Sequence, residues 1–146
     1  MCYIIGITHR IFFVIYEYKG SEAMIIEIDF NSNEALYIQL RNQIILGIAN
    51  SKISEGESLP SVRDLAEDIG INMHTVNKAY ALLKQEGYLR LDRRSGAVIC
   101  VDADKYKARQ ELMEQLIVTL AKGACKGVTR QEVHKAVDEI FDSFQL

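Results

Sequence analysis

The sequence lacks tryptophan and contains a single proline and nine glycines in 146 residues. This composition argues against a long disordered linker or a low-complexity tail. The three cysteines, Cys2, Cys100 and Cys125, are odd in number and far apart, which favours reduced thiols over a disulfide framework or a zinc site. The sequence has no phosphate-binding loop and no Ser, His and Asp constellation, so we expect neither an enzyme nor a cofactor. Cys125 and His134 lack a third ligand at suitable spacing, and we expect no metal site.

The chain also lacks an excess of positive charge. Its formal net charge is −3, which alone weighs against binding to an anionic polymer. Between Gly70 and Val101, however, five basic and two acidic residues give a local charge of +3. The basic residues are Lys78, Lys84, Arg90, Arg93 and Arg94, and the acidic ones are Glu86 and Asp92. Basic charge is therefore concentrated in one part of an acidic chain.

Residues 1–23 form an apolar N-terminal extension to which the sequence assigns no role. A membrane span needs about 20 largely uncharged residues, and ionisable side chains interrupt this stretch. The alternation of apolar side chains predicts two short strands that turn near Thr8 and His9. Two alternatives stay open: the working protein begins at Met24, or the extension is a membrane tether. We expect a cytoplasmic protein without a membrane partner.

Residues 24–101 combine helical patterns with a hairpin. A first helix, capped by Ser32 or Asn33, carries an apolar residue at every fourth position. A second, short helix opens at Pro60, with a capping box formed by Ser61 and Asp64, and ends at Gly70. The apolar positions are Leu36, Leu40, Ile44 and Ile48 in the first helix and Val62, Leu65, Ala66 and Ile69 in the second.

A third helix begins three residues after that glycine, because Asn72 is a favourable N-cap, and Gly87 ends it. Its inward face is predicted to consist of Val76, Ala79, Tyr80 and Leu83. Two strands, 88–91 and 97–101, follow and are joined by the turn 92–96. Two short helices joined by a tight glycine turn, followed by an arginine-tipped hairpin, indicate a DNA-binding helix-turn-helix with a wing.

Residues 102–146 are predicted to be a helical dimerisation region. One apolar stripe runs to a break at Gly123 and Gly127. A capping box of Thr129 and Glu132 then opens a last helix. Because two amphipathic helices enclose little between themselves, a second copy of the chain is the expected partner. The predicted dimerisation residues are Tyr106, Leu112, Leu116, Ile117, Leu120, Val133, Val137, Ile140, Phe141 and Phe144.

The segments LPSVRDLA (59–66), GIN (70–72), TVNKAY (75–80) and EGYL (86–89) resemble the winged helix-turn-helix domain of GntR-type transcription regulators. The segment ALYIQL (35–40) looks like that family's first-helix motif, and the resemblance extends over about residues 33–101. The short helical tail resembles the YtrA-like subgroup, whose tail serves dimerisation. The implied fold is mainly α with a small β-hairpin wing, followed by two C-terminal helices.

The resemblance implies a DNA interface, position by position. It assigns a phosphate or base contact to Arg63 and places the wing glycine at Gly96. Met73 and Asn77 stand where many members have arginine, and Arg94 stands where the wing often has a glycine. The predicted DNA-binding residues are Arg63, Asn72, Met73, His74, Thr75, Asn77, Lys78, Arg93, Arg94 and Gly96.

The sequence therefore predicts a homodimeric, sequence-specific transcription regulator, a repressor, on an inverted-repeat operator of double-stranded DNA. The alternative is a winged-helix protein-interaction module that does not read DNA, which the acidic total charge and the uncharged Met73 and Asn77 favour. The sequence names no small-molecule effector.

Overall fold

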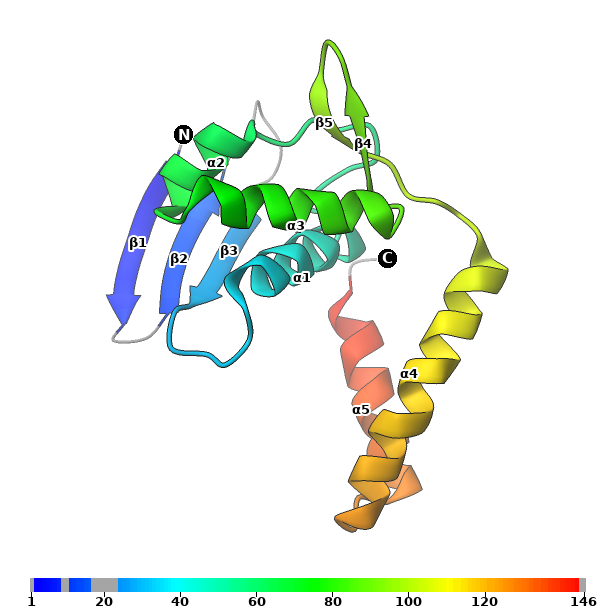
Figure 1. Cartoon of the computed structure of the whole chain (residues 1–146). Helices are drawn as coiled ribbons and strands as arrows, with labels where there is room; N and C mark the ends of the chain where they lie inside the picture. Colours follow the sequence, from blue (N-terminus) through cyan, green and yellow to red (C-terminus); the bar gives the residue numbers. More distant parts are fainter. Residues whose placement is uncertain (1, 9–10, 17–23, 145–146) are drawn as a thin grey trace. The chain divides into compact units, whose positions relative to one another are not determined.

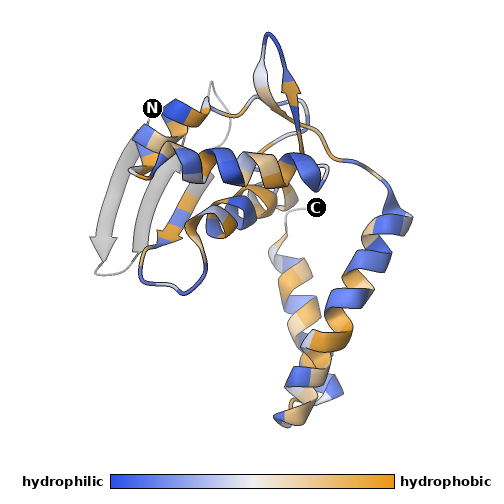
Figure 2. Cartoon of the chain, viewed as in Figure 1, coloured by the Kyte–Doolittle hydropathy of each residue, from blue (hydrophilic) through white to orange (hydrophobic). Residues whose placement is uncertain are grey.

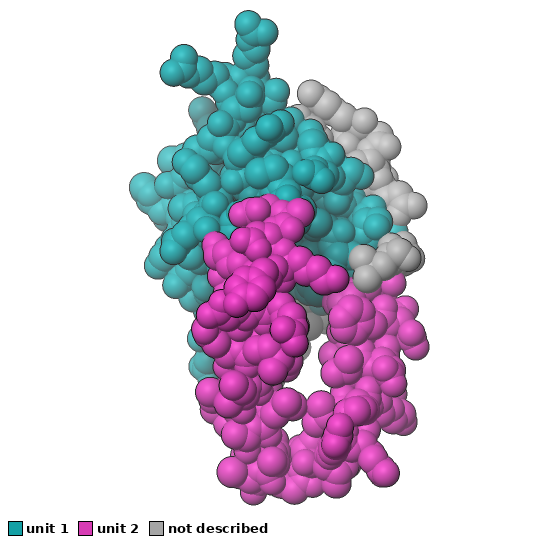
Figure 3. All heavy atoms as spheres, turned by 90° about the vertical axis from the view of Figure 1, so that its right-hand side faces the viewer, with its two compact units in different colours: residues 1–101, 146 teal, residues 102–145 magenta. Residues whose placement is uncertain are grey.

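The computed structural model describes the backbone of residues 2–8, 11–16 and 24–144 and the side chains of residues 26–144. The chain divides into two compact units, residues 1–101 and 102–145, which Figure 3 distinguishes by colour. In chain order the elements are β1 (Cys2–Thr8), β2 (Ile11–Tyr16), β3 (Met24–Asp29), α1 (Leu36–Ala49), α2 (Val62–Ile69), α3 (Met73–Gln85), β4 (Leu89–Asp92), β5 (Gly96–Ile99), α4 (Lys105–Cys125) and α5 (Arg130–Ser143).

The first unit begins with an antiparallel sheet in the order β1-β2-β3, shown in blue in Figure 1. The two strands predicted in the N-terminal extension are confirmed, whereas the turn expected at His9 lies outside the described residues. The third strand was not predicted. It pairs with β2 over its full length and contributes the buried side chains of Ile26 and Ile28, which join the core of the first unit.

Helix α1 begins later than the sequence predicts. Its N-cap is Ala35, and neither Ser32 nor Asn33 caps it. The Ser32 hydroxyl instead accepts a bond of 3.1 Å from the Glu34 backbone N–H, inside the preceding loop. The buried Gln39 carboxamide holds that loop: its oxygen accepts from the Asp29 N–H, and its nitrogen donates to the carbonyl oxygens of Asp29 and Glu34. A side chain inside α1 therefore fixes the loop that leads into the helix.

Helix α3 packs on α1, α2 packs on α3, and side chains of all three helices join the core of this unit. All four predicted inward residues of α3 are buried, as are Leu65, Ala66 and Ile69 of α2, while Val62 is half-buried. Burial of these side chains stabilises the unit by about 25 cal/mol per Å² of apolar surface removed from water. The predicted helix-turn-helix is confirmed.

The wing is the two-stranded antiparallel sheet of β4 and β5, with Leu89 paired to Ile99 and Asp92 to Gly96. The first strand begins and ends one residue later than the expected 88–91, and the second begins one residue earlier and ends two residues earlier than the expected 97–101. The predicted turn 92–96 is therefore too long, because Asp92 and Gly96 still pair. The buried residues Ala97, Val98 and Ile99 anchor β5 to the body of the unit.

The second unit consists of α4 and α5. The helix break predicted at Gly123 is wrong, because α4 continues to Cys125. The glycine with a left-handed backbone is Gly127, with φ 87°. Phe144 is the C-cap of α5 and not part of the helix. The capping box of Thr129 and Glu132 is confirmed. Neither helix contains a buried residue, and Figure 2 shows orange apolar segments along both.

The expected fold class is confirmed: mainly helical, with a hairpin wing and two C-terminal helices. Among the described residues, no helix is long and apolar enough to cross a membrane.

Candidate nucleic-acid interface

The turn between α2 and α3 sets the angle at which α3 leaves the body of the first unit. Gly70 has φ 75°, a left-handed conformation that costs other residues steric energy, and its N–H bonds to the carbonyl of Ala66. Two residues later the side chain of Asn72 accepts a bond of 2.8 Å from the backbone N–H of His74 and starts α3. Both caps are local, so the tripeptide Gly70–Asn72 specifies the turn.

The solvent-facing side of α3 carries polar residues at its N-terminal end. Asn72, His74, Asn77 and Lys78 are exposed, and Thr75 is half-buried. Met73 is 49% exposed, so an apolar side chain occupies part of the same surface. Asn and Thr side chains can hydrogen-bond base edges, and a Met side chain can contact a thymine methyl group. All residues predicted to read DNA in this helix therefore have access to solvent.

Arg63 lies in the first turn of α2, exposed to solvent, two residues after the N-cap Ser61. The Ser61 hydroxyl accepts from the Asp64 backbone N–H at 3.2 Å. Just before this cap, the carbonyl of Pro60 accepts a bond of 3.0 Å from the buried hydroxyl of Tyr80. This bond ties the entry of α2 to the middle of α3, so Arg63 has a fixed place relative to the exposed side of α3.

The tip of the wing presents Arg93 and Arg94, both exposed. One carboxylate oxygen of Asp92 accepts bonds of 2.8 Å from the backbone N–H groups of Arg94 and Ser95. These bonds, that from Ser95 first, hold the pKa of Asp92 below its usual value. Gly96, with φ 72°, completes the turn. An acidic side chain thus shapes the loop that displays the two arginines.

The two sets of predicted DNA contacts lie at opposite ends of α3. The reading residues occupy its N-terminal turns, whereas the wing follows its C-terminal end (Figure 1). A helix of 13 residues is about 20 Å long. The geometry suits a helix N-terminus in the major groove and a wing on a separate stretch of groove or backbone.

Tyr37, which the sequence did not point to, lies beside this surface. The ammonium of Lys78 lies 3.9 Å from the centre of the Tyr37 ring, which belongs to the first turn of α1. Tyr37 is half-buried and packs against the core. The only sequence signal was its place in the segment ALYIQL, which carries no information about a partner in α3.

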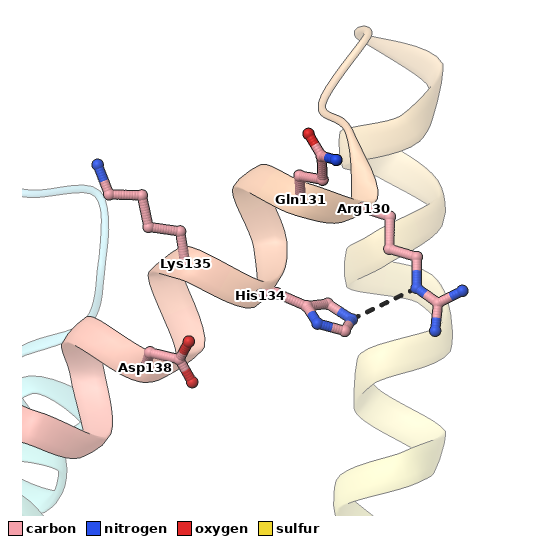
Figure 4. Close-up of a pocket in the computed structure, with 5 residues that line it drawn as sticks. All are labelled: Arg130, Gln131, His134, Lys135 and Asp138. Atoms are coloured by element: carbon pink, nitrogen blue, oxygen red, sulfur yellow. Dashed lines mark hydrogen bonds between the residues drawn. The ribbon is translucent and has the colours of Figure 1, made fainter.

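In the second unit, the predicted dimerisation residues are all exposed or half-buried. A shallow hollow of about 440 Å³ on α4 is lined by side chains that include Ile117, Val118 and Ala121. Another, of about 430 Å³, lies on α5, where Arg130 Nε donates to His134 Nε2 at 3.4 Å (Figure 4). In the described part of the chain, no group of three His, Cys, Asp or Glu side chains is arranged to hold a metal ion.

Comparison with known proteins identifies the fold and the family. Residues 32–99 match the family described as bacterial regulatory proteins, gntR family. The repressor YtrA of Bacillus subtilis is 32% identical over 79% of this chain and 91% of its own length. The uncharacterised regulator YhcF of the same organism is 26% identical over 74% of this chain and 91% of its own.

Solved structures agree. A protein described as a transcriptional antiterminator from Listeria monocytogenes EGD-e is 30% identical and covers 77% of this chain and 87% of its own, with a TM-score of 0.71. YtrA from Sulfolobus acidocaldarius, a GntR-family transcription factor, is 36% identical over 63% of this chain and 97% of its own, with a TM-score of 0.53. These likenesses, together with the exposed reading helix and wing, lead to one conclusion: the chain belongs to the GntR family of DNA-binding transcription regulators and is similar to its YtrA-like members.

Proposed function

We propose that the protein is a cytoplasmic, sequence-specific repressor that binds an inverted-repeat operator as a homodimer. The observation that carries this proposal is the exposed polar N-terminal end of α3 beside Arg63, with an arginine-tipped wing after the same helix. In this proposal, the side chains of Asn72, His74 and Asn77 contact base edges. Arg63, Lys78 and the wing arginines contact phosphates or the minor groove.

The homodimer is supported by the second unit. Its helices bury no side chain of their own, and Ile117, Ile140 and Phe141 are each more than half exposed. In proteins most helix stability comes from the packing of an apolar face, so a partner surface would supply much of the stability of α4 and α5. A two-fold dimer would place two reading helices on half-sites about 34–36 Å apart, or a multiple of that distance. The repressor role is supported by the description of the B. subtilis relative YtrA as a repressor.

The test is a binding titration with duplex DNA from the region upstream of the protein's own gene, at several salt concentrations. We expect the wild-type protein to bind tightly and in a salt-dependent way. Changing Arg63 to Ala should weaken binding, and each 1.4 kcal/mol of binding free energy that is lost raises the dissociation constant about tenfold. Arg63→Lys is the matched variant, because it keeps the charge and loses the planar fork of donors. Equal affinity for the upstream region and for unrelated duplexes would contradict sequence-specific recognition.

A protein-interaction module without DNA-reading activity is the second candidate. Two exposed apolar side chains favour it: Met73, at 49%, on the reading helix and Leu91, at 64%, on the wing. Complete absence of DNA binding by the wild-type protein at low salt would favour this class over the first. Base-specific changes in affinity after substitution of Asn72 or His74 would eliminate it.

A further inference from the structure

The reading helix contains few cations with which to hold the DNA backbone. Its basic residues are Lys78 and Lys84, and Lys84 lies in the last turn. Met73 and Asn77, in the first two turns, are uncharged. Of the two lysines within α3, Lys78 is therefore the one nearer the reading end, one helical turn after His74 and exposed like it.

Lys78 lies against a neighbouring helix. Its ammonium is 3.9 Å from the centre of the Tyr37 ring, within the distance at which the negative face of an aromatic ring attracts a cation. Tyr37 itself is held in place, because its half-buried side chain packs against the core of the first unit. The ring is thus a fixed platform under a side chain that otherwise has four rotatable bonds.

A ring under an ammonium still leaves N–H donors directed to solvent. Lysine carries three donors on a tetrahedral nitrogen, and a phosphate on the open side can accept from them. Holding the side chain in one region before DNA arrives reduces the rotamer entropy that binding would otherwise cost. The pair lies on the α1 side of the reading helix, whereas Arg63 is supplied by α2.

We propose that Tyr37 is a positioning residue of the DNA interface: its ring holds the Lys78 ammonium for a backbone phosphate on the α1 side of α3. This inference rests on the proposed DNA-binding function. It assigns a role to a residue outside the helix-turn-helix and the wing. It also indicates how a reading helix without arginine at positions 73 and 77 keeps a phosphate contact.

The test is a double-mutant cycle measured as affinity for two duplexes, one from the protein's own upstream region and one of unrelated sequence. The proteins are wild type, Tyr37→Leu, Tyr37→Phe, Lys78→Ala, Arg63→Ala and the two double variants Tyr37→Leu/Lys78→Ala and Tyr37→Leu/Arg63→Ala. We expect Lys78→Ala to weaken binding to both duplexes and to lower the dependence of log K on log salt by about 0.9. Tyr37→Leu should weaken binding by roughly two- to fivefold when Lys78 is present.

The decisive comparison is the effect of Tyr37→Leu with and without Lys78. We expect the loss to vanish in the Lys78→Ala background and to persist in the background of Arg63→Ala, which lies on the other neighbouring helix. Tyr37→Phe keeps the ring and should bind like wild type. An equal loss with and without Lys78 would overturn the proposal, because Tyr37 would then act through packing or through its own hydroxyl.

If Tyr37→Leu does not fold, the wild-type protein still allows a test of the contact between Tyr37 and Lys78. Protons on the Lys78 side chain next to the ammonium should show an upfield ring-current shift in the NMR spectrum, assigned by its loss in Lys78→Ala. Absence of that shift in the wild-type protein would also overturn the proposal. If the wild type binds neither duplex at low salt, the DNA-binding function itself fails. If it binds and only the coupling is absent, this inference alone fails.

Discussion

The hydroxyl of Tyr80, in the middle of α3, donates a hydrogen bond of 3.0 Å to the carbonyl oxygen of Pro60, just before α2. Tyr80 is 4% exposed, so removal of its hydroxyl leaves the Pro60 carbonyl oxygen without this donor inside the protein. We expect Tyr80→Phe to lower the free energy of unfolding by about 1–2 kcal/mol. Urea denaturation measures this change. Tyr88→Phe, on a half-buried ring, is the matched control, and an equal loss in both variants would contradict the specific role of the Pro60 bond.

The wing turn should depend on the oxygen of Asp92 and not on its charge. Asp92→Asn keeps an acceptor for the N–H groups of Arg94 and Ser95, whereas Asp92→Ala removes it. We expect faster amide hydrogen exchange at these two residues in Asp92→Ala and wild-type protection in Asp92→Asn. Weaker DNA binding should accompany only the alanine variant. Wild-type protection in both variants would show that the strand pairing alone holds the turn, and fast exchange in both would show that the charge is needed.

The same turn predicts a pH dependence. The pKa of Asp92 is lowered in the folded protein, first by the bond from the Ser95 backbone N–H and then by that from Arg94. The stabilisation is therefore fully present above the unfolded pKa of about 4, and it is lost as the pH falls through the lower, folded pKa. We expect exchange at Ser95, corrected for its intrinsic pH dependence, to rise as the pH falls from about 4 through the folded pKa of Asp92. Asp92→Asn should lack this transition, and its persistence there would assign it to another group.

Two glycines should respond to alanine in opposite directions. At Gly70, with φ 75°, a side chain is strained although nothing lies within 4 Å of an added Cβ, and we expect Gly70→Ala to cost about 1–2 kcal/mol. Gly123 lies inside α4 with ordinary helical backbone, and an added Cβ would meet Val128 Cβ at 3.5 Å, normal van der Waals contact. Gly123→Ala should stabilise α4 by up to about 1 kcal/mol. Thermal melting of both variants checks the pair, and a stabilising Gly70→Ala would contradict the role of the turn.

Association through the second unit should be sensitive to charge on its apolar surface. Ile117 is 64% exposed on α4, and a carboxylate there would have to be desolvated in a helical interface. We expect Ile117→Glu to shift the protein from dimer to monomer by sedimentation or light scattering. Gln115→Glu adds the same charge to an exposed polar position of the same helix and should leave the dimer intact. A dimer that survives Ile117→Glu would place the interface elsewhere.

Elements with local signals were predictable from the sequence. Ser61, Gly70 and Asn72 each cap a helix through bonds to residues no more than four positions away, and the caps at Gly70 and Asn72 were predicted correctly. The helix expected from Pro60 begins at Val62, and of the capping box expected for Ser61 and Asp64 the structure shows the bond from the Asp64 backbone N–H to the Ser61 hydroxyl. The start of α1 was predicted wrongly, because Gln39 fixes it by bonds that reach back ten residues to Asp29. No local pattern reports such a bond.

The candidate site shows the same limit. The exposure of Asn72, His74 and Asn77 followed from helix periodicity, because the apolar positions define the opposite face. The contact between Tyr37 and Lys78 joins two helices, so it depends on how α1 and α3 pack. Periodicity within either helix gives no sign of that packing.

The absence of any buried side chain in α4 and α5 has a consequence for gene control. If these helices gain their order from a second copy, then dimer formation, helix stability and operator occupancy belong to one linked equilibrium. Below the dimer dissociation constant, occupancy would rise with the square of the protomer concentration. A twofold change in the number of copies per cell would then change operator occupancy about fourfold while occupancy is low, which would give the promoter a concentration threshold.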